Sequence, residues 1–334
     1  MTRETSPFLS ILVPLDGSPL AEQALALASN IAQRAGSKLR LVLAHQLPSA
    51  PLDPLAAKLF TSIERATRKS ERAYLRGIQA KLRQGGTRLS SAVTLTGKAG
   101  LELAQHVREL GIDLVVMATH GRGGIQRAWL GSVADHLIRT LEVPVLLVRP
   151  REGEAARDRP PGVGQILVPL DGSPLAEEAL DAAVVLARIW DAEITLLQVV
   201  RPVLLSVDPA LLLSSAYDEG ITGSWRQQAQ DYLDDVVEQM HGQGLRATGV
   251  AVVGWNAADA ILNVARPERV AVVALATHGR GGLRRLILGS VADKLVRGAD
   301  VPVLVCRPTG RRKAKKRSAN QAQAHGRVAA RGAR

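Results

Sequence analysis

A carboxylate follows the same apolar run at two places in this sequence. The letters ILVPLDGSPLAE occupy residues 11–22 and return unchanged at residues 166–177. Packing alone does not require an identical sequence, because a buried strand can be built from many combinations of Val, Ile and Leu. Asp16 and Asp171 could accept hydrogen bonds from a polar ligand edge such as adenine or ribose. The alternative is structural, since an Asp at a strand end can simply close an Asx turn.

A glycine-rich segment that could bind an anion is also duplicated. The repeated letters are ATHGRGG at 118–124 and 276–282, followed by LGSVAD at 130–135 and 288–293. Gly121 and its neighbouring glycines would let backbone amides approach a ligand closely. The pair Gly131–Ser132 then opens a helix, whose N-terminus attracts negative charge. Arginines in these loops could add charge, although solvation is the usual fate of a loop arginine.

The same motifs also fit ordinary helix starts. Ser18 is a natural N-cap, and Pro19 is a natural first helical residue. Ser132 and Asp135 could form a capping box, with Ser132 capping the later helix and Asp135 reaching back to its amide. These structural roles are compatible with ligand binding, because a capping box orders the helix terminus that would receive a phosphate.

Apolar runs alternate with segments of helical periodicity and must position these motifs. In the first copy the expected strands are about 9–15, 39–45, 89–95, 114–118 and 143–148, and the expected helices contain 21–34, 58–83, 101–110 and 133–140. The second copy repeats the scheme with strands near 165–170, 193–199, 247–253, 270–276 and 301–306. Continuous apolar strands followed by helices predict a parallel sheet that is covered on both faces. If the strand order is 3-2-1-4-5, the two motifs flank the switch point, where such sheets bind ligands.

The repeat divides the chain of 334 residues into two domains. We place the first domain at 1–150, a charged linker with paired prolines at 151–164, the second domain at 165–309 and a basic tail at 310–334. No apolar stretch approaches the roughly 20 residues of a membrane span. The single cysteine, Cys306, excludes an intrachain disulfide and is expected to be a buried, inert thiol. We therefore expect a soluble, cytoplasmic protein.

The net charge of +12 is concentrated at the end of the chain. Residues 310–334 carry nine Lys and Arg and no acid, which leaves 34 basic and 31 acidic residues elsewhere. This composition predicts a disordered tail that could contact nucleic acid or anionic surfaces nonspecifically. A solvated tail with no dedicated partner is the alternative.

Taken together, these motifs resemble the universal stress protein family in its tandem form. The likeness rests on LVPLDGS at the first strand, a His-Gly loop after the fourth strand and GSVAD at the last helix, in both copies. It covers nearly the whole chain except the tail. The resemblance implies two tandem doubly wound α/β domains, each a five-stranded parallel sheet of order 3-2-1-4-5 with helices on both faces. It also implies a stress-response protein that binds ATP, with or without Mg²⁺, and acts by binding and conformational change.

The resemblance further implies one nucleotide site in each copy. The family's phosphate pattern begins with a glycine that Ala118 and Ala276 replace here, at a cost of roughly 1–2 kcal/mol if the position needs a left-handed backbone. On the second strand Val199 fits a small apolar contact, and we take Gln46 as its counterpart, so the second site is expected to bind more tightly. The implied site residues are Pro14, Asp16, Met117, Ala118, His120, Gly121, Gly131, Ser132 and Val133, and then Pro169, Asp171, Val199, Leu275, Ala276, His278, Gly279, Gly289, Ser290 and Val291.

Other functions stay open at this point. A slow ATPase or nucleotidyl enzyme could use the same site, and a nucleotide-free protein could act through its basic tail. The histidines lack metal-ligand spacing, so we predict no metal site. Ser18, His120 and Asp16 could border one crevice, but the chain lacks the G-x-S-x-G motif of a hydrolase, and no catalytic residue is assigned. We also expect the VPVL runs at Val143 and Val301 to pair, so that the copies pack as a pseudo-dimer. A further homo-oligomer is compatible with this arrangement.

Overall fold

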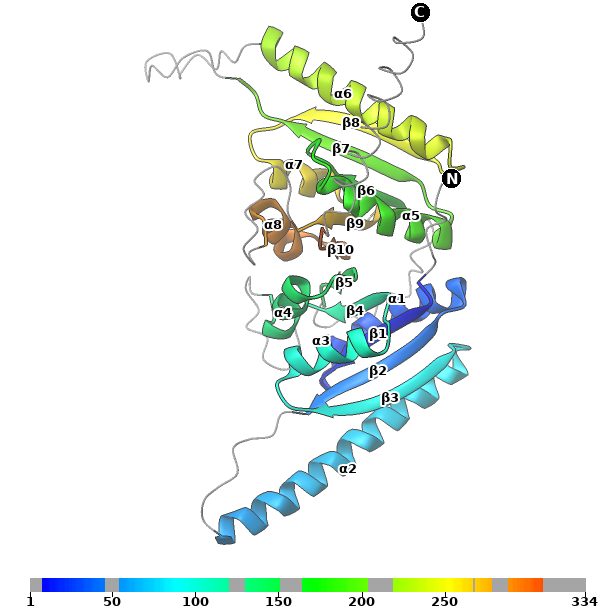
Figure 1. Ribbon diagram of the computed structural model, residues 1–334, viewed down its shortest axis with the longest axis vertical. Helices are drawn as coiled ribbons and strands as arrows, with labels where there is room; N and C mark the ends of the chain where they lie inside the picture. The colour runs from blue at the N-terminus through cyan, green and yellow to red at the C-terminus, as the bar shows by residue number, and fades with distance from the viewer. Residues whose placement is uncertain are drawn as a thin grey trace, which may run out of the picture.

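Ten strands in the described part of the chain form one continuous sheet. The computed structural model describes residues 8–45, 54–119, 130–150, 164–203, 219–266, 268–277 and 288–308. Across this part of the chain the strand order is β3-β2-β1-β4-β5-β10-β9-β6-β7-β8 (Figure 1). Each half therefore has the predicted order 3-2-1-4-5, and the last strands of the two halves are neighbours.

The strands end close to the residues expected from the apolar runs. In the first half they are β1 (Ser10–Leu15), β2 (Lys38–His45), β3 (Leu89–Thr96), β4 (Leu114–Ala118) and β5 (Val145–Val148). In the second half they are β6 (Gln165–Pro169), β7 (Ile194–Val200), β8 (Ala247–Val253), β9 (Val270–Ala276) and β10 (Val303–Cys306). Pairing within each half is parallel, as predicted.

Helices cover both faces of this sheet. One face packs against α1 (Pro19–Ala35), α2 (Pro54–Gln84), α5 (Ala179–Trp190) and α6 (Glu219–His241). The other packs against α3 (Ala99–Glu109), α4 (Ser132–Thr140), α7 (Ala257–Val264) and α8 (Ser290–Gly298). Neighbouring strand residues point to opposite faces, so Ile11 and Val13 belong to the first hydrophobic cluster and Leu12 to the second. None of the described helices is both long and apolar enough to span a membrane.

Helix α1 begins and ends where its sequence signals lie. Ser18 is the N-cap, and its hydroxyl oxygen accepts a hydrogen bond from the amide of Ala21 at 3.2 Å. Pro19 is the first helical residue, as predicted. The helix ends at Gly36, whose φ of 67° is a left-handed conformation that favours glycine, and its amide donates to the carbonyl of Ala32. In the second copy the same letters begin with a 3-10 turn, η1 (Ala176–Glu178), before α5.

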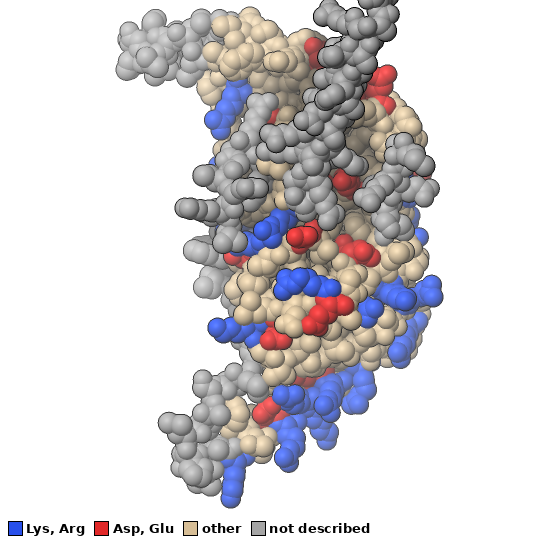
Figure 2. Space-filling view, in the orientation of Figure 1, with Lys and Arg blue, Asp and Glu red and all other residues tan. Residues whose placement is uncertain are grey.

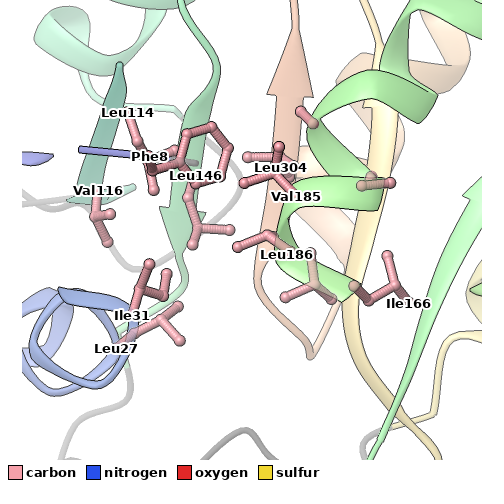
Figure 3. Packing of buried hydrophobic residues seen from close by; sticks show 14 of the residues in the cluster. Phe8, Leu27, Ile31, Leu114, Val116, Leu146, Ile166, Val185, Leu186 and Leu304 are labelled. Carbon is pink, nitrogen blue, oxygen red and sulfur yellow. The ribbon is translucent and has the colours of Figure 1, made fainter. Parts of the chain in front are cut away.

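The two halves meet along β5 and β10. These strands pair antiparallel, with Leu304 opposite Leu146, and both side chains are fully buried. Figure 3 shows the two leucines beside Leu186 of α5 and within the same cluster as Ile31 of α1. The expected pairing of the VPVL runs is thus confirmed. We call this boundary the seam.

Polar contacts also cross the seam. The indole Nε1 of Trp190 donates to Oδ1 of Asn30 at 3.0 Å, which joins α5 to α1. Arg307 donates from Nη1 to the carbonyl oxygen of Thr140 at 3.2 Å. Segments 151–163 and 309–334, which hold most of the predicted linker and the predicted tail, lie outside the described residues, so the domain boundaries stay predictions.

Candidate functional site

The duplicated motifs lie where the strand order reverses. β1 has β2 on one side and β4 on the other, and β6 lies in the same way between β7 and β9. Within each half the strands are parallel, so the carboxyl ends of the central strand and its neighbours lie together, on the usual ligand side of a doubly wound fold. The repeated Asp-Gly-Ser and the strand that leads into the His-Gly loop therefore flank the switch point in each half, as predicted.

Asp16 and Asp171 each close a turn at the carboxyl end of the first strand of their half. Oδ1 of Asp16 accepts hydrogen bonds from the amide of Ser18 at 2.9 Å and from its hydroxyl at 2.6 Å. Oδ1 of Asp171 accepts from the amide of Ser173 at 2.9 Å. Gly17, between Asp16 and Ser18, has a φ of 80°, which explains why a glycine follows the carboxylate. The Asx turn is thus formed, and a ligand role of either Asp stays a prediction.

The predicted capping box at α4 is wrong. Gly131 is the N-cap, Ser132 is the first helical residue, and no side chain of the described residues caps this end of the helix. The carboxylate of Asp135 instead accepts two hydrogen bonds from the guanidinium of Arg139, each at 2.8 Å. A bidentate charge-assisted pair one turn along the helix is stronger than a bond back to a neutral amide, which explains the difference.

Helix α8 begins in the same way as α4. Gly289 is its N-cap and has no side-chain cap, while Asp293 accepts from Nε of Arg297 at 2.8 Å. The first amides of both helices are therefore not occupied by a side-chain cap from the described residues. Such N-termini carry a partial positive charge and can receive an anion.

Gly289 holds the start of α8 against the end of β9. Its amide donates to the carbonyl of Thr277 at 2.9 Å, and Gly131 makes the equivalent bond to Thr119 at 2.8 Å. A Cβ on Gly289 would lie 2.9 Å from the carbonyl oxygen of Thr277, closer than side chains tolerate. Its φ is −58°, so glycine is needed here for close approach and not for an unusual backbone.

A cavity of about 1240 Å³ opens at the switch point of the second half. It brings together eight of the predicted residues, namely Pro169, Asp171, Val199, Leu275, Ala276, Gly289, Ser290 and Val291. The other two predicted residues of this half, His278 and Gly279, lie outside the described part of the chain. The cavity exceeds the roughly 300–1,000 Å³ of typical small-molecule sites, so a nucleotide would fit.

Sequence reasoning missed the wall of this cavity that comes from β7 and α6. Gln198, Arg201, Trp225 and Tyr232 line it, and Trp225 remains 50% exposed. The side-chain oxygen of Gln198 is buried and has no hydrogen-bond partner among the described residues. A tryptophan in a chain with only 3% aromatic residues was the one sequence signal that pointed to α6.

Two predictions about differences between the sites need correction. Strand register pairs Pro14 with Val42 and Pro169 with Leu197, so the counterpart of Val199 is Ala44 and not Gln46. Gln46 itself lies outside the described residues. Because Ala44 is also small and apolar, the expected weakness of the first site loses its basis.

Ala118 and Ala276 carry no left-handed strain. They end β4 and β9, where they pair with Val148 and Cys306, and neither has a positive φ. The cost of roughly 1–2 kcal/mol for a left-handed alanine therefore does not apply at these positions. The departure from the family's leading glycine adds a methyl group to a regular strand end.

The site residues of the first half lie at equivalent positions. Pro14 is in β1, and Met117 is buried near the end of β4, as Leu275 is in β9. Gly131, Ser132 and Val133 open α4, whereas His120 and Gly121 lie outside the described residues. The halves differ at the end of the second strand, where His45 corresponds to Val200 in the register and its Nδ1 lies 2.7 Å from Oε1 of Glu71.

The titratable groups near the sites limit the chemistry that can occur there. Asp171 is the only carboxylate among the described residues that line the cavity. No group of three His, Cys, Asp or Glu side chains in the described part of the chain could hold a metal ion. Burial raises the pKa of the Cys306 thiol to about 12, with smaller contributions from Asp181 and Glu178, so this cysteine is inert as predicted.

Comparison with known proteins agrees with this architecture. A model of the universal stress protein family matches residues 7–149 and again residues 162–307. The universal stress protein Rv1996 of Mycobacterium tuberculosis is 26% identical over 318 residues, which covers 90% of this chain and 95% of that protein. The universal stress protein YxiE of Bacillus subtilis is 30% identical over 146 residues, 43% of this chain and 98% of its own length.

A solved structure supports the fold over nearly the same length. The crystal structure of a universal stress protein from Archaeoglobus fulgidus superimposes with a TM-score of 0.64 at 18% sequence identity and covers 89% of this chain and 98% of that one. The two family matches account for both halves of the ten-stranded sheet. This chain therefore belongs to the universal stress protein family, as a tandem member with two family domains.

Proposed function

We propose that the protein binds an adenine nucleotide, ATP, in the cavity of its second half and acts by binding and conformational change. The observation that carries this proposal is the cavity of about 1240 Å³ at the carboxyl ends of β6, β7 and β9. It lies at the switch point, and its lining includes the N-terminus of a helix together with apolar and polar side chains. An equivalent site in the first half is part of the proposal.

The lining of the cavity offers groups that suit both parts of a nucleotide. Gly289 and Ser290 open α8, where the first amides and the helix dipole would stabilise a phosphate. Val199 and Leu275 offer apolar surface to a base. The buried oxygen of Gln198 has no described partner, so it could accept a hydrogen bond from a base amino group.

Binding, and not hydrolysis, is the activity that these groups favour. The carboxylate of Asp171 is the only one in the described lining, and one of its oxygens already closes a turn. A Mg²⁺ ion that accompanied ATP would be held mainly by phosphates and waters. The lone cysteine fits a reducing compartment, which supports the cytoplasm as the place of action.

The test compares ATP affinities of Asp171→Asn and the parent by titration calorimetry. Asparagine keeps an oxygen that can accept from the amide of Ser173, so the turn is retained while the negative charge is lost. We expect about tenfold weaker binding, which corresponds to about 1.4 kcal/mol. The control is Asp231→Asn on the exposed side of α6, which should bind ATP as the parent does.

Other outcomes would separate the remaining possibilities. Equal affinities of Asp171→Asn and the parent would remove Asp171 from the site, and a parent that binds no ATP would overturn the proposal. Stoichiometric formation of ADP by the same samples would identify a slow ATPase. Repeating the measurement with Asp16→Asn tells which half holds the nucleotide.

A further inference from the structure

Helix α2 carries a long row of positive charges. Its sequence holds eight Lys and Arg but only two Glu. Six of the basic residues follow each other at spacings of 7, 4, 3, 4 and 7 positions, and all six are exposed: Lys58, Arg65, Lys69, Arg72, Arg76 and Arg83. At about 100° per residue these spacings place them within a sector of about 60° around the helix axis. We call these six residues the basic row.

The acids of α2 do not neutralise the basic row. Glu64 pairs with Arg68, which lies outside the row, at 2.9 Å. Glu71 faces inward and contacts Nδ1 of His45 at 2.7 Å. None of the six side chains of the row forms an ion pair with a residue that the structure describes. The row therefore presents a single sign of charge to solvent.

The position of α2 leaves this charge accessible. The helix lies along the β3 edge of the sheet and projects past the strands at its N-terminal end (Figure 1). Figure 2 shows Lys and Arg gathered over this part of the surface, at the lower edge of the view. At about 1.5 Å per residue, the row from Lys58 to Arg83 extends for about 37 Å.

We propose that the basic row binds the phosphate backbone of duplex nucleic acid without sequence preference. A duplex carries one negative charge per about 1.7 Å of its axis, so it can match the row along its whole length. That length is about one helical turn of a duplex, which is about 34–36 Å. The row contains no aromatic side chain that could stack on a base, so its contacts would be to phosphates.

An acidic helix of a second copy is a poorer match. Among the described side chains of helix α6, four acids are exposed, namely Asp231, Asp234, Asp235 and Glu238. They extend for only about 10 Å along the helix, less than a third of the row. Side-chain amides of Gln227 and Gln230 already donate to Asp231 and Asp234, each at 2.8 Å.

An anionic membrane is also disfavoured as the partner. Interfacial helices insert apolar residues that lie beside their charges. Among the side chains of α2 that the structure describes, the exposed large apolar ones are Leu59 and Ile63, both close to the N-terminal end of the helix. At about 100° per residue they lie more than about 100° around the helix from the centre of the row. A bilayer in contact with the row would therefore not bury them.

The test measures binding of the full chain to two labelled 20-bp duplexes of unrelated sequence by fluorescence anisotropy across a salt series. The row variant is Arg65→Gln, Arg72→Gln and Arg76→Gln. The matched control is Arg34→Gln, Lys98→Gln and Arg226→Gln, which removes three exposed charges elsewhere. Both variants keep the basic C-terminal segment, so its contribution cancels in the comparison.

We expect the parent to bind both duplexes with equal affinity. The row variant should bind at least about tenfold more weakly, and the slope of log K against log salt should fall by about 2.7, or about 0.9 for each lost contact. In the control, the duplex affinity and the salt slope should both fall far less. Circular dichroism should show unchanged helix content in both variants, and ATP binding of the row variant in the cavity of the second half should stay at the parent level because α2 belongs to the first half.

Four results of the binding measurements would overturn the proposal. They are no duplex binding by the parent, equal losses in the row variant and the control, strong preference for one duplex sequence, and row-dependent binding of phosphatidylserine vesicles without duplex binding. Sedimentation velocity without nucleic acid provides the last check. Self-association that disappears in the row variant would assign the row to a second copy of the chain instead.

Discussion

The two halves share their sheet but differ in the helix that covers its outer edge. Strand order and pairing are the same in both, and both place a Gly-Ser helix start at the switch point. By contrast, α2 has 31 residues with eight basic and two acidic side chains, whereas α6 has 23 residues with one Arg and five acids. Residues that position the switch point are held by backbone contacts on several sides. An outer helix presents one side to solvent, and its charge is free to diverge.

A second difference lies at the end of the second strand. His45 contacts Glu71 of α2, whereas its counterpart Val200 lines the cavity beside α6. In the second half the outer helix thus contributes to one wall of the cavity. We expect nucleotide affinity there to depend on this wall more than on the repeated motifs.

The largest effect is expected where the halves depend on each other. Leu146→Ala and Leu304→Ala each remove a fully buried side chain at the seam, and each should lower the free energy of unfolding by about 2–5 kcal/mol. Because the two residues are opposite each other in the β5–β10 pairing, their effects should not add. Urea unfolding of the two single variants and the double variant measures the coupling.

Leu59→Ala is the control for this experiment, because Leu59 is 63% exposed. It should change stability by less than about 0.5 kcal/mol. Two separate unfolding transitions in the parent, or strict additivity at the seam, would show that the halves fold independently.

A smaller effect is expected at the helix start of the second site. Gly289→Ala puts a Cβ 2.9 Å from the carbonyl oxygen of Thr277, so the start of α8 must shift. We expect a loss of about 1–3 kcal/mol in stability and weaker ATP binding. Gly223→Ala, in α6, is the control, since a Cβ there meets nothing within 4 Å. Full stability of Gly289→Ala would mean that close approach is not the reason for this glycine.

The smallest effect at neutral pH is expected at the ends of the seam strands. Cys306 ends β10, and burial raises the pKa of its thiol from 9.0 to about 12. Below pH 9 the thiol is protonated in both the folded and the unfolded chain, so it gives no pH dependence. Between pH 9 and pH 12 only the unfolded chain ionises, and the free energy of unfolding falls by at most about 1.4 kcal/mol per pH unit.

Cys306→Val, which copies Val148 of the first half, should remove this dependence. Its stability at pH 7 should lie within about 1 kcal/mol of the parent. Chemical denaturation from pH 7 to pH 10.5 compares the two slopes. Parallel slopes for parent and variant would mean that the thiol does not titrate differently on folding.

Much of the fold could be predicted because local and global signals agree. The apolar runs are continuous and indicate the strands, and the pair Ser18 and Pro19 indicates the start of α1 from the sequence alone. The site was predicted less completely. The offset that relates residues 11–22 to residues 166–177 also relates Ala44 to Val199, and the strand pairing agrees. The assignment of Gln46 was therefore wrong although the sequence held the information to avoid it.

Other features needed spatial information that letters do not carry. Asp135 had two possible partners within its own helix, and the charge of Arg139 decided between them. Trp225 and Tyr232 belong to α6, whose sequence is not repeated in the first copy. The internal repeat therefore could not identify this wall of the cavity. From the sequence alone, a phosphate-binding loop and close backbone packing explain the glycine at the start of α8 equally well. The position of the Thr277 carbonyl shows that close packing requires it.

The hydrogen bond from Trp190 to Asn30 is not repeated by the equivalent residues of the two halves. In the repeat, Trp190 corresponds to Ala35 and Asn30 corresponds to Val185, so neither mirror position can form it. In a dimer of identical chains every contact off the axis occurs twice and each substitution changes both. Joining the two partners in one polypeptide lifts that requirement. Each side of the interface can then specialise alone, and the tethered partners meet at a high effective concentration however dilute the protein is.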